Sequence, residues 1–178
     1  MLPLSLDITT SPILLVGRGP ALERRVALVR QSGARQMRVH AAEAAAGLPS
    51  GMEIAAARLL FVAGLPTDTA RPLAEAARER RVLVNVEDVP ALCDFHIPAL
   101  VRRGDLSIAI STAGRGPGLA AALRRRLERQ FGAEWAGHVA AAGSLRARLR
   151  DAGLPPAEIA REMERRADAW LRPGPDPS

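Results

Sequence analysis

The sequence predicts an α/β fold in which a doubly wound parallel sheet is followed by a helical C-terminal region. Short apolar runs, typical of buried parallel strands, alternate with helical segments as far as residue 110. Beyond that residue the pattern is almost wholly helical. Alternating strands and helices favour a parallel sheet covered on both faces, because the connections between parallel strands are right-handed crossovers.

The first elements form a strand–helix–strand unit. Residues 13–16 are continuously apolar and end in Gly17, as a buried strand does. A helix is expected to begin near Pro20, which suits a first helical position, and to end at Gly33, which can form a left-handed C-cap. Its apolar face comprises Leu22, Val26 and Val29. Residues 37–40 alternate into a second strand, which completes a unit of roughly the usual 30 residues.

Further elements continue this order along the chain. We expect strands at residues 59–62, 82–84 and 106–110. We expect helices at residues 69–81, 135–150 and 158–171, and a helix whose buried face is Leu119, Leu123 and Leu127 and whose solvated face is Arg124, Arg125 and Arg126. The predicted parts are an α/β domain over residues 1–112, a helical region over 113–171 and a disordered tail over 172–178.

The composition limits the classes of function. With 178 residues, of which 48% are apolar and 25% charged, the chain can bury one core. No segment approaches the roughly 18 consecutive apolar residues of a membrane helix. The start also lacks the basic flank of a signal peptide, so we expect a cytoplasmic protein without membrane contact. Aromatic residues make up 3% and tyrosine is absent, which argues against nucleic-acid binding through stacked bases.

The net charge of +6 comes from an excess of arginine. The planar fork of arginine binds carboxylates and phosphates, so an anionic partner is one explanation, and a solvated surface is the other. The single cysteine, Cys93, excludes an internal disulfide and is expected to be a small buried thiol.

A glycine-rich turn joins the first strand to the first helix. Residues 17–22 read GRGPAL, and Gly17 and Gly19 stand where the backbone of a Rossmann-like fold turns tightly and approaches a pyrophosphate. The N-terminus of the helix would hold that pyrophosphate. The turn therefore predicts a dinucleotide site, and a plain tight turn is the alternative. Leu22 stands where a small residue is usual and is expected to crowd the helix against the strand.

The end of the second strand should contact the ribose of a bound dinucleotide. His40 occupies that end and Glu43 follows it, so Glu43 is the candidate partner of the ribose hydroxyls. A solvent-facing loop carboxylate is the alternative. No arginine closely follows this strand to hold a 2′-phosphate, which predicts a preference for NAD⁺ over NADP⁺.

A carboxylate, Asp88, follows the expected strand at residues 82–84, where the carboxyl end of a parallel strand should open on the ligand crevice. Asp88 could move a proton or contact a divalent metal, or it could cap the turn before Pro90. Asn85, at the same strand end, is a candidate for substrate binding. His96 could be a metal ligand or a proton carrier near Asp88, and a structural role is the alternative.

The small, polar and flexible loop at residues 111–118 is suited to cradle an anionic ligand. Its candidate substrate-binding residues are Ser111, Thr112, Gly114 and Arg115. Arg115 could pair with a carboxylate, and an exposed loop arginine is the alternative.

Taken in order, these segments resemble the family of precorrin-2 dehydrogenases and sirohydrochlorin ferrochelatases, whose module also forms the N-terminal half of fused siroheme synthases. The resemblance spans most of the chain, and its strongest part runs from residue 85 to residue 114. The matching segments are LPLSLD at residues 2–7, VGRG at 16–19, ERR at 23–25, NVED at 85–88, FHIP at 95–98 and ISTAG at 110–114.

The resemblance implies an oxidoreductase that uses NAD⁺ to remove hydride from precorrin-2, giving sirohydrochlorin. In bifunctional members the same crevice then accepts Fe²⁺ as the substrate of a ferrochelatase. The family's essential aspartate matches Asp88, which would also contact the metal, and its C-terminal helices build a homodimer and help to cover the site. The residues that match its NAD contacts are Pro20, Ala21, Ala42 and Glu43, with Gly17 and Gly19 shaping the turn.

Two other classes of function compete with this enzyme. One is a non-enzymatic protein that binds a dinucleotide or a tetrapyrrole, against which the presence of Asp88 argues. The other is a nucleic-acid binder, which would need a continuous positive face and a recognisable reading element, and the sequence indicates neither.

Overall fold

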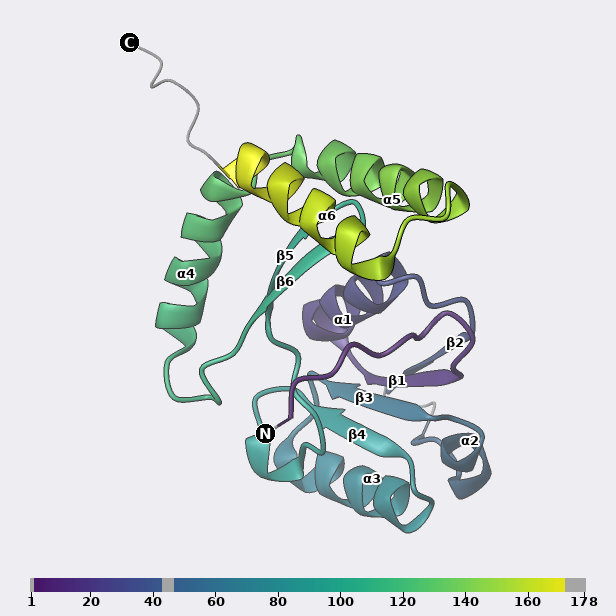
Figure 1. The fold of residues 1–178 in the computed structure, drawn as a ribbon. Coiled ribbons are helices and arrows are strands. Elements are labelled where there is room, and N and C mark those ends of the chain that lie inside the picture. Colours follow the sequence, from purple (N-terminus) through teal and green to yellow (C-terminus); the bar gives the residue numbers. More distant parts are fainter. Residues whose placement is uncertain (1, 43–46, 172–178) are drawn as a thin grey trace. The chain divides into compact units, whose positions relative to one another are not determined.

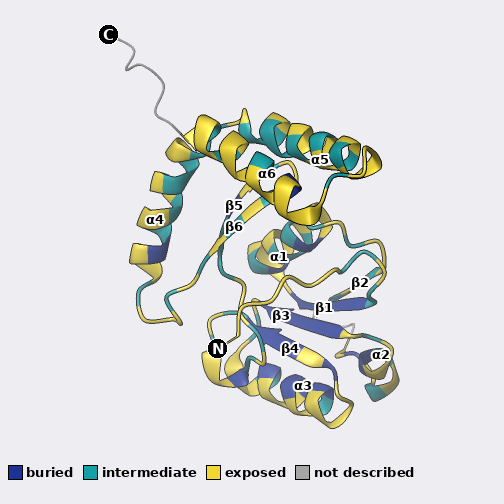
Figure 2. Cartoon of the chain, in the orientation of Figure 1, coloured by how far each residue is buried: buried dark blue, intermediate teal, exposed yellow. Residues whose placement is uncertain are grey.

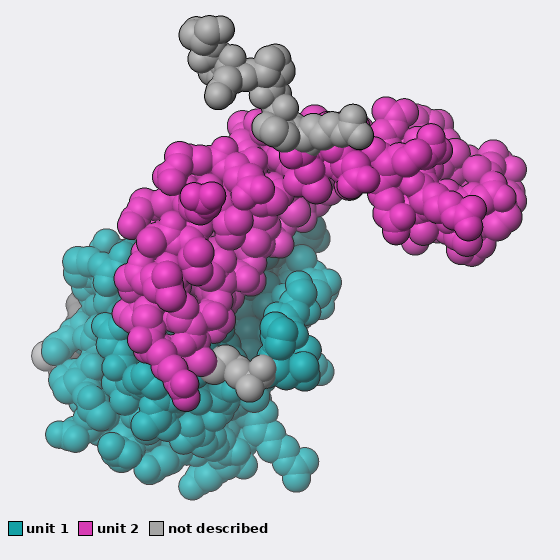
Figure 3. Space-filling view, turned by 60° about the vertical axis from the view of Figure 1, so that its left-hand side comes forward, with its two compact units in different colours: residues 1–97 teal, residues 98–178 magenta. Residues whose placement is uncertain are grey.

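The computed structural model describes residues 2–42 and 47–171, and the chain divides into two compact units, residues 1–97 and residues 98–178 (Figure 3). The predictions made for Glu43 and for a tail over residues 172–178 lie outside the described residues. Within the described ranges, the helices are all too short or too polar to cross a membrane.

The first unit is built on a four-stranded parallel sheet with the order β2-β1-β3-β4 (Figure 1). The strands are β1 (Ile13–Gly17), β2 (Met37–Ala41), β3 (Leu59–Ala63) and β4 (Leu83–Val86). The helices are α1 (Gly19–Gln31), α2 (Gly51–Ala55) and α3 (Thr67–Glu79), with a short 3-10 helix at Pro90–Leu92. The strand order reverses between β1 and β3, and ligands of such sheets bind at the carboxyl ends of the strands at this point. The predicted doubly wound α/β fold is confirmed.

The central strands β1 and β3 are buried on both faces (Figure 2). Successive side chains of a strand point to opposite faces, so they divide between two apolar clusters. The cluster that includes α3 contains Leu14, Val16, Leu60, Val62, Leu73 and Ala77. The cluster that includes α1 contains Ile13, Leu15, Leu22, Val29, Leu59 and Phe61. Each fully buried valine, leucine, isoleucine or phenylalanine side chain stabilises the fold by about 1.5–3 kcal/mol, so the sheet holds the loops at its end in place.

Leu22, which was expected to crowd α1 against the strand, lies in the apolar core. Its side chain is 7% exposed and packs in the α1 cluster. The helix therefore uses this larger residue as part of its core face, where a glycine or alanine would allow a closer approach of helix and strand.

A hairpin, β5 (Ala99–Arg103) and β6 (Leu106–Ile110), opens the second unit as a separate two-stranded antiparallel sheet. The strand expected at residues 106–110 is present with these bounds, but its partner is β5 rather than the parallel sheet. Gly104, with a φ of +56°, allows the tight turn that joins antiparallel neighbours. The units consequently divide after residue 97, and not after residue 112 as expected.

Three helices complete the second unit: α4 (Pro117–Gln130), α5 (Trp135–Asp151) and α6 (Pro156–Leu171). The guanidinium of Arg103 in β5 donates to the carbonyl oxygens of Phe131 (2.8 Å) and Glu128 (3.0 Å), and it thereby satisfies the C-terminal end of α4. Helices α5 and α6 lie side by side, and the ring of His138 stacks on that of Trp170 with centroids 4.6 Å apart.

Two of the three leucines expected on the buried face of α4 are exposed, while the third, Leu127, is half-buried. Leu119 is 59% exposed and Leu123 is 39% exposed, whereas the buried residue of this helix is Ala120. Arg124, expected on the solvated face, is half-buried and pairs with Glu128. A small side chain at the buried position lets α4 approach its neighbours closely, and the two leucines remain on an accessible surface.

Candidate functional site

The carboxyl ends of β1 and β3 meet where their backbones nearly touch. A Cβ atom on Gly17 would lie 1.9 Å from the carbonyl oxygen of Ala63. The amide of Arg18 donates to the same oxygen (3.2 Å), and the amide of Ala42 donates to the carbonyl oxygen of Gly17 (2.8 Å). The glycine predicted to shape the turn is therefore required by the close approach of β3, and hydrogen bonds tie together the ends of three strands.

Helix α1 begins at this point with an uncapped N-terminus. Arg18 is the N-cap residue but makes no side-chain hydrogen bond to the helix, and the first turn contains no acidic residue. The N–H groups of the first turn, such as that of Ala21, lack intrahelical partners, and Pro20 has no N–H to satisfy. Gly19 has a φ of +61°, and a Cβ atom there would meet nothing within 4 Å. The turn thus fits a pyrophosphate, which the positive end of the helix attracts.

An open pocket adjoins the turn. It is lined by Arg18, Ala42, Gly47, Leu48, Leu65, Pro66 and Thr69. These residues follow the carboxyl ends of β1, β2 and β3 or lie in the first turns of α3. A mixture of apolar side chains with a few polar groups suits a nucleoside. Ala42 was predicted to contact the dinucleotide, whereas sequence reasoning missed Arg18, Leu65 and Thr69. The signal for Arg18 was its place between the two glycines.

Asp88 lies just beyond β4 in the left-handed conformation, with a φ of +59°. Backbone hydrogen bonds close its turn, from the N–H of Val89 to the carbonyl of Val86 (3.3 Å) and from the N–H of Leu92 to the carbonyl of Val89 (3.0 Å). In the part of the chain that the structure describes, the exposed carboxylate of Asp88 has no hydrogen bond or ion pair. This carboxylate is therefore available to a ligand and does not cap the turn before Pro90.

Two arginines of α1 bring positive charge to this loop. Nη2 of Arg24 lies 3.7 Å from Oε1 of Glu87. The guanidinium of Arg25 lies over the ring of Phe61, 5.5 Å from its centroid. Burial lowers the pKa of Arg25, and the negative charges of Glu87 and Asp88 oppose that shift. Asp88 consequently lies within electrostatic range of a partly buried cation.

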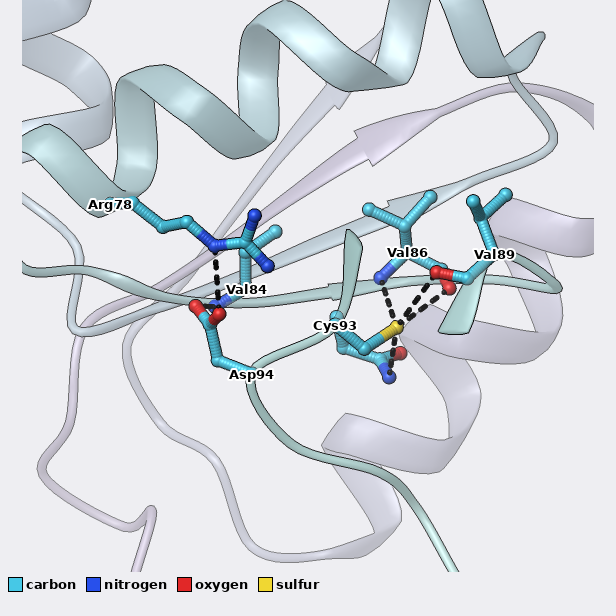
Figure 4. A network of polar contacts seen from close by, with 7 residues as sticks. Arg78, Val84, Val86, Val89, Cys93 and Asp94 are labelled. Carbon is cyan, nitrogen blue, oxygen red and sulfur yellow. Dashed lines mark hydrogen bonds and ion pairs between the residues drawn. The ribbon is translucent and has the colours of Figure 1, made fainter. Parts of the chain in front are cut away.

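Asn85 and Cys93 fasten the loop after β4 to the strand. Asn85 is 6% exposed, and its Nδ2 donates to the carbonyl oxygen of Phe95 (2.9 Å) and to Sγ of Cys93 (3.5 Å). Figure 4 shows the Cys93 thiol, which donates to the carbonyl oxygen of Val86 (3.1 Å) and accepts the N–H of the same residue (3.2 Å). The thiol is half-buried rather than fully buried. Asn85 supports the loop, and its contact with a substrate stays a prediction.

The predicted metal ligands do not form a preorganised site. His96 is exposed, and no hydrogen bond joins it to Asp88. Among residues 2–42 and 47–171, no three His, Cys, Asp or Glu side chains are grouped so as to hold a metal ion. The described residues could therefore provide an entering divalent cation with individual ligands, but they do not form a complete coordination site.

The predicted substrate loop lies in the second unit, between β6 and α4. The hydroxyl oxygens of Ser111 and Thr112 accept backbone N–H groups of the loop itself, at 3.2 and 3.3 Å. Gly114 has a φ of +78°, and Arg115 is exposed. The hydroxyl groups therefore shape the loop, and the binding of a substrate there stays a prediction.

Two family models match the chain. One, described as putative NAD(P)-binding, matches residues 4–99. The other, described as sirohaem biosynthesis protein central, matches residues 103–130. The first match falls on the unit that carries the glycine turn, and the second runs from the last residue of β5 through β6 to the end of α4.

Curated relatives and a solved structure agree with these matches. The chain is 32% identical over 173 residues to the siroheme synthase of Thiobacillus denitrificans, covering 86% of this chain and 35% of that protein. It is 33% identical over 175 residues to the siroheme synthase of Thioalkalivibrio sulfidiphilus, covering 90% and 36%. The chain therefore spans about a third of the length of these relatives. The structure of SirC, precorrin-2 dehydrogenase, matches 96% of this chain and 92% of its own with a TM-score of 0.73 at 19% identity, which shows a shared fold.

Proposed function

The chain belongs to the family of the N-terminal module of siroheme synthase, and we propose that it catalyses the NAD-dependent oxidation of precorrin-2 to sirohydrochlorin. The observation that carries this proposal is an open glycine turn at the reversal of strand order, together with the unpaired carboxylate of Asp88 in the same unit. When bound, NAD⁺ supplies the acceptor of a hydride. Gly17, Gly19, Pro20, Ala21 and Ala42 would hold it at the turn, with Glu43 at its ribose.

The oxidation removes a hydride and a proton from precorrin-2. Asp88 accepts the proton in this proposal, since its carboxylate is exposed and has no protein partner among the described residues. Its left-handed backbone conformation fits such a role, because strained residues of this kind cluster at functional sites. Asn85 holds the loop that carries Asp88, and residues 111–115 would bind carboxylates of the tetrapyrrole.

Insertion of Fe²⁺ into sirohydrochlorin is a second candidate activity, with iron as the substrate. The same unpaired carboxylate of Asp88 favours it, since an ionised oxygen ligand attracts a divalent cation. A non-enzymatic protein that binds a dinucleotide or tetrapyrrole is the alternative from another class. Such a protein would share the glycine turn but would not oxidise precorrin-2.

The deciding experiment incubates the purified chain with precorrin-2 and NAD⁺ and follows NADH and sirohydrochlorin by absorbance. We expect both products to form in equal amounts, and neither to form when NAD⁺ is omitted. Binding of NAD⁺ and precorrin-2 without turnover would favour the non-enzymatic alternative. Addition of Fe²⁺ after complete oxidation then tests for siroheme.

We expect NAD⁺ to bind more tightly than NADP⁺, because Glu43 would repel a 2′-phosphate. The substitution Glu43→Gln should narrow the preference by weakening this repulsion. Isothermal titration calorimetry of both dinucleotides with both proteins measures the two ratios. Equal or tighter binding of NADP⁺ by the parental protein would remove Glu43 from the ribose site.

We further expect a homodimer that uses the second unit, since Leu119 (59% exposed) and Leu123 (39% exposed) present apolar surface on one helix. Light scattering at micromolar concentration should give twice the mass of one chain. The double substitution Leu119→Glu and Leu123→Glu should give a monomer, whereas Met52→Glu, at an 84% exposed residue of α2, should leave the dimer intact. A fully active monomeric parental protein would contradict this proposal.

A further inference from the structure

The pocket beside the glycine turn is lined by the positively charged side chain of Arg18, which has no role in the proposed function so far. Arg18 lines this pocket together with Ala42, which directly follows β2. In dinucleotide-binding folds the residues after the second strand lie at the ribose of the adenosine, where discrimination between NAD⁺ and NADP⁺ takes place. The structure thus places Arg18, from the loop after β1, beside the segment after β2 that was expected to contact the ribose.

The guanidinium of Arg18 is fixed at one nitrogen and open at the others. Nε donates to the carbonyl oxygen of Gly64 (3.2 Å), which follows β3. Within the described ranges, no hydrogen bond or ion pair engages Nη1 or Nη2, and the residue is exposed. A Cβ atom on Gly64 would lie 2.4 Å from the carbonyl oxygen of Arg18, so the absence of a side chain there allows the two loops to meet. One hydrogen bond therefore orients the fork without occupying the pair of nitrogens that would bind a phosphate.

The rest of the pocket suits an adenosine that carries an anion. Its apolar side chains are Leu48, Leu65 and Pro66, and its hydroxyl group is that of Thr69. Among the described residues that line it, none is acidic. A phosphate monoester carries a charge of about −1.5 to −2 at neutral pH, and arginine binds it through two parallel hydrogen bonds.

We propose that Arg18 is a specificity-determining residue that binds the 2′-phosphate of NADP⁺, so that the chain accepts NADP⁺ as a second, weaker dinucleotide. This inference rests on the proposed function, since it concerns the same cofactor site. The competing role for Arg18 is a contact with the pyrophosphate, which both dinucleotides share.

Calorimetric titration separates these roles. For Arg18→Met we expect NADP⁺ to bind at least roughly tenfold more weakly, the scale of a lost charged hydrogen bond, and NAD⁺ to change by less than about threefold. Arg18→Lys, which keeps the charge but not the fork, should fall between the parental protein and Arg18→Met for NADP⁺. Two fragments that lack the nicotinamide half test the same contact. Arg18→Met should weaken the binding of adenosine 2′,5′-bisphosphate but not that of adenosine 5′-monophosphate.

Arg30→Met is the matched control, because it removes an exposed arginine from the last turn of α1, at the opposite end of the helix from Arg18. It should leave both affinities unchanged. Equal losses of NAD⁺ and NADP⁺ binding in Arg18→Met would assign the residue to the pyrophosphate and overturn the inference, as would unchanged binding of both. A shifted ratio of affinities in a protein that does not oxidise precorrin-2 would support the inference and contradict the proposed reaction. A parental protein that binds neither dinucleotide contradicts both.

Discussion

Asp88→Asn is expected to lower the rate of precorrin-2 oxidation by roughly 10²- to 10⁴-fold, the usual scale for loss of a general base. The amide keeps the shape of the side chain, but it can neither accept a proton nor attract a cation. Asparagine also tolerates the left-handed backbone found at this position, so the turn should be preserved. Steady-state formation of NADH measures the rate, while circular dichroism and NAD⁺ titration should match the parental protein.

His96→Ala is the companion variant, since His96 is an exposed residue of the same unit. We expect it to oxidise precorrin-2 at nearly the parental rate. If the imidazole is a ligand of the entering iron, this variant slows metal insertion alone. Parental oxidation together with normal Fe²⁺ insertion in Asp88→Asn would mean that the family's catalytic role has not carried over to this chain.

Gly17→Ala is expected to destabilise the protein by about 3 kcal/mol or more, at or beyond the upper end of the usual cost of overpacking a core. The added Cβ atom would lie 1.9 Å from the backbone carbonyl oxygen of Ala63, so β1 and β3 must separate at the reversal of strand order. The same movement would distort the turn, so NAD⁺ binding should be lost as well. Urea denaturation followed by circular dichroism measures the change in free energy of unfolding.

Gly143→Ala provides the opposite outcome from the same chemical change. Gly143 lies inside α5, and a Cβ atom there would meet nothing within 4 Å. Alanine should therefore stabilise the helix by about 0.5–1 kcal/mol. A Gly17→Ala protein with parental stability and NAD⁺ affinity would show that β3 can move away without cost, and the glycine would lose its proposed role.

The sequence was sufficient for the first sheet because each of its signals is local. A continuous apolar run ending in Gly17 marks β1, and the runs at β3 and β4 follow the same rule. The hairpin required information of another kind. The alternation at residues 106–110 predicts a strand but not its partner, and β5 was not expected because residues 99–103 offer only a short run that ends in two arginines.

The candidate residues that lie within one segment could be predicted from the sequence. Those that depend on contacts between distant segments could not. Asp88 and the turn from Gly17 to Ala21 were predicted from the sequence as site residues, and the structure places both after strands of the parallel sheet. The position of Arg18 in the pocket was missed because the side chain is oriented by a hydrogen bond to Gly64, which is distant in the sequence. The capping alternative for Asp88 could be rejected only from the structure, because among the described residues its carboxylate has no hydrogen-bond partner.

The separation of the chain into two contiguous units has a consequence for protein synthesis. All strands of the parallel sheet come from residues 13–86, and the central strand β1 leaves the ribosome before the strands that flank it. The first unit can therefore fold as a unit while the second is still being synthesised. The loops that form the pocket beside the glycine turn are made before the hairpin and helices of the second unit. A dinucleotide that binds this early unit stabilises it by mass action while the ribosome is still adding the remainder.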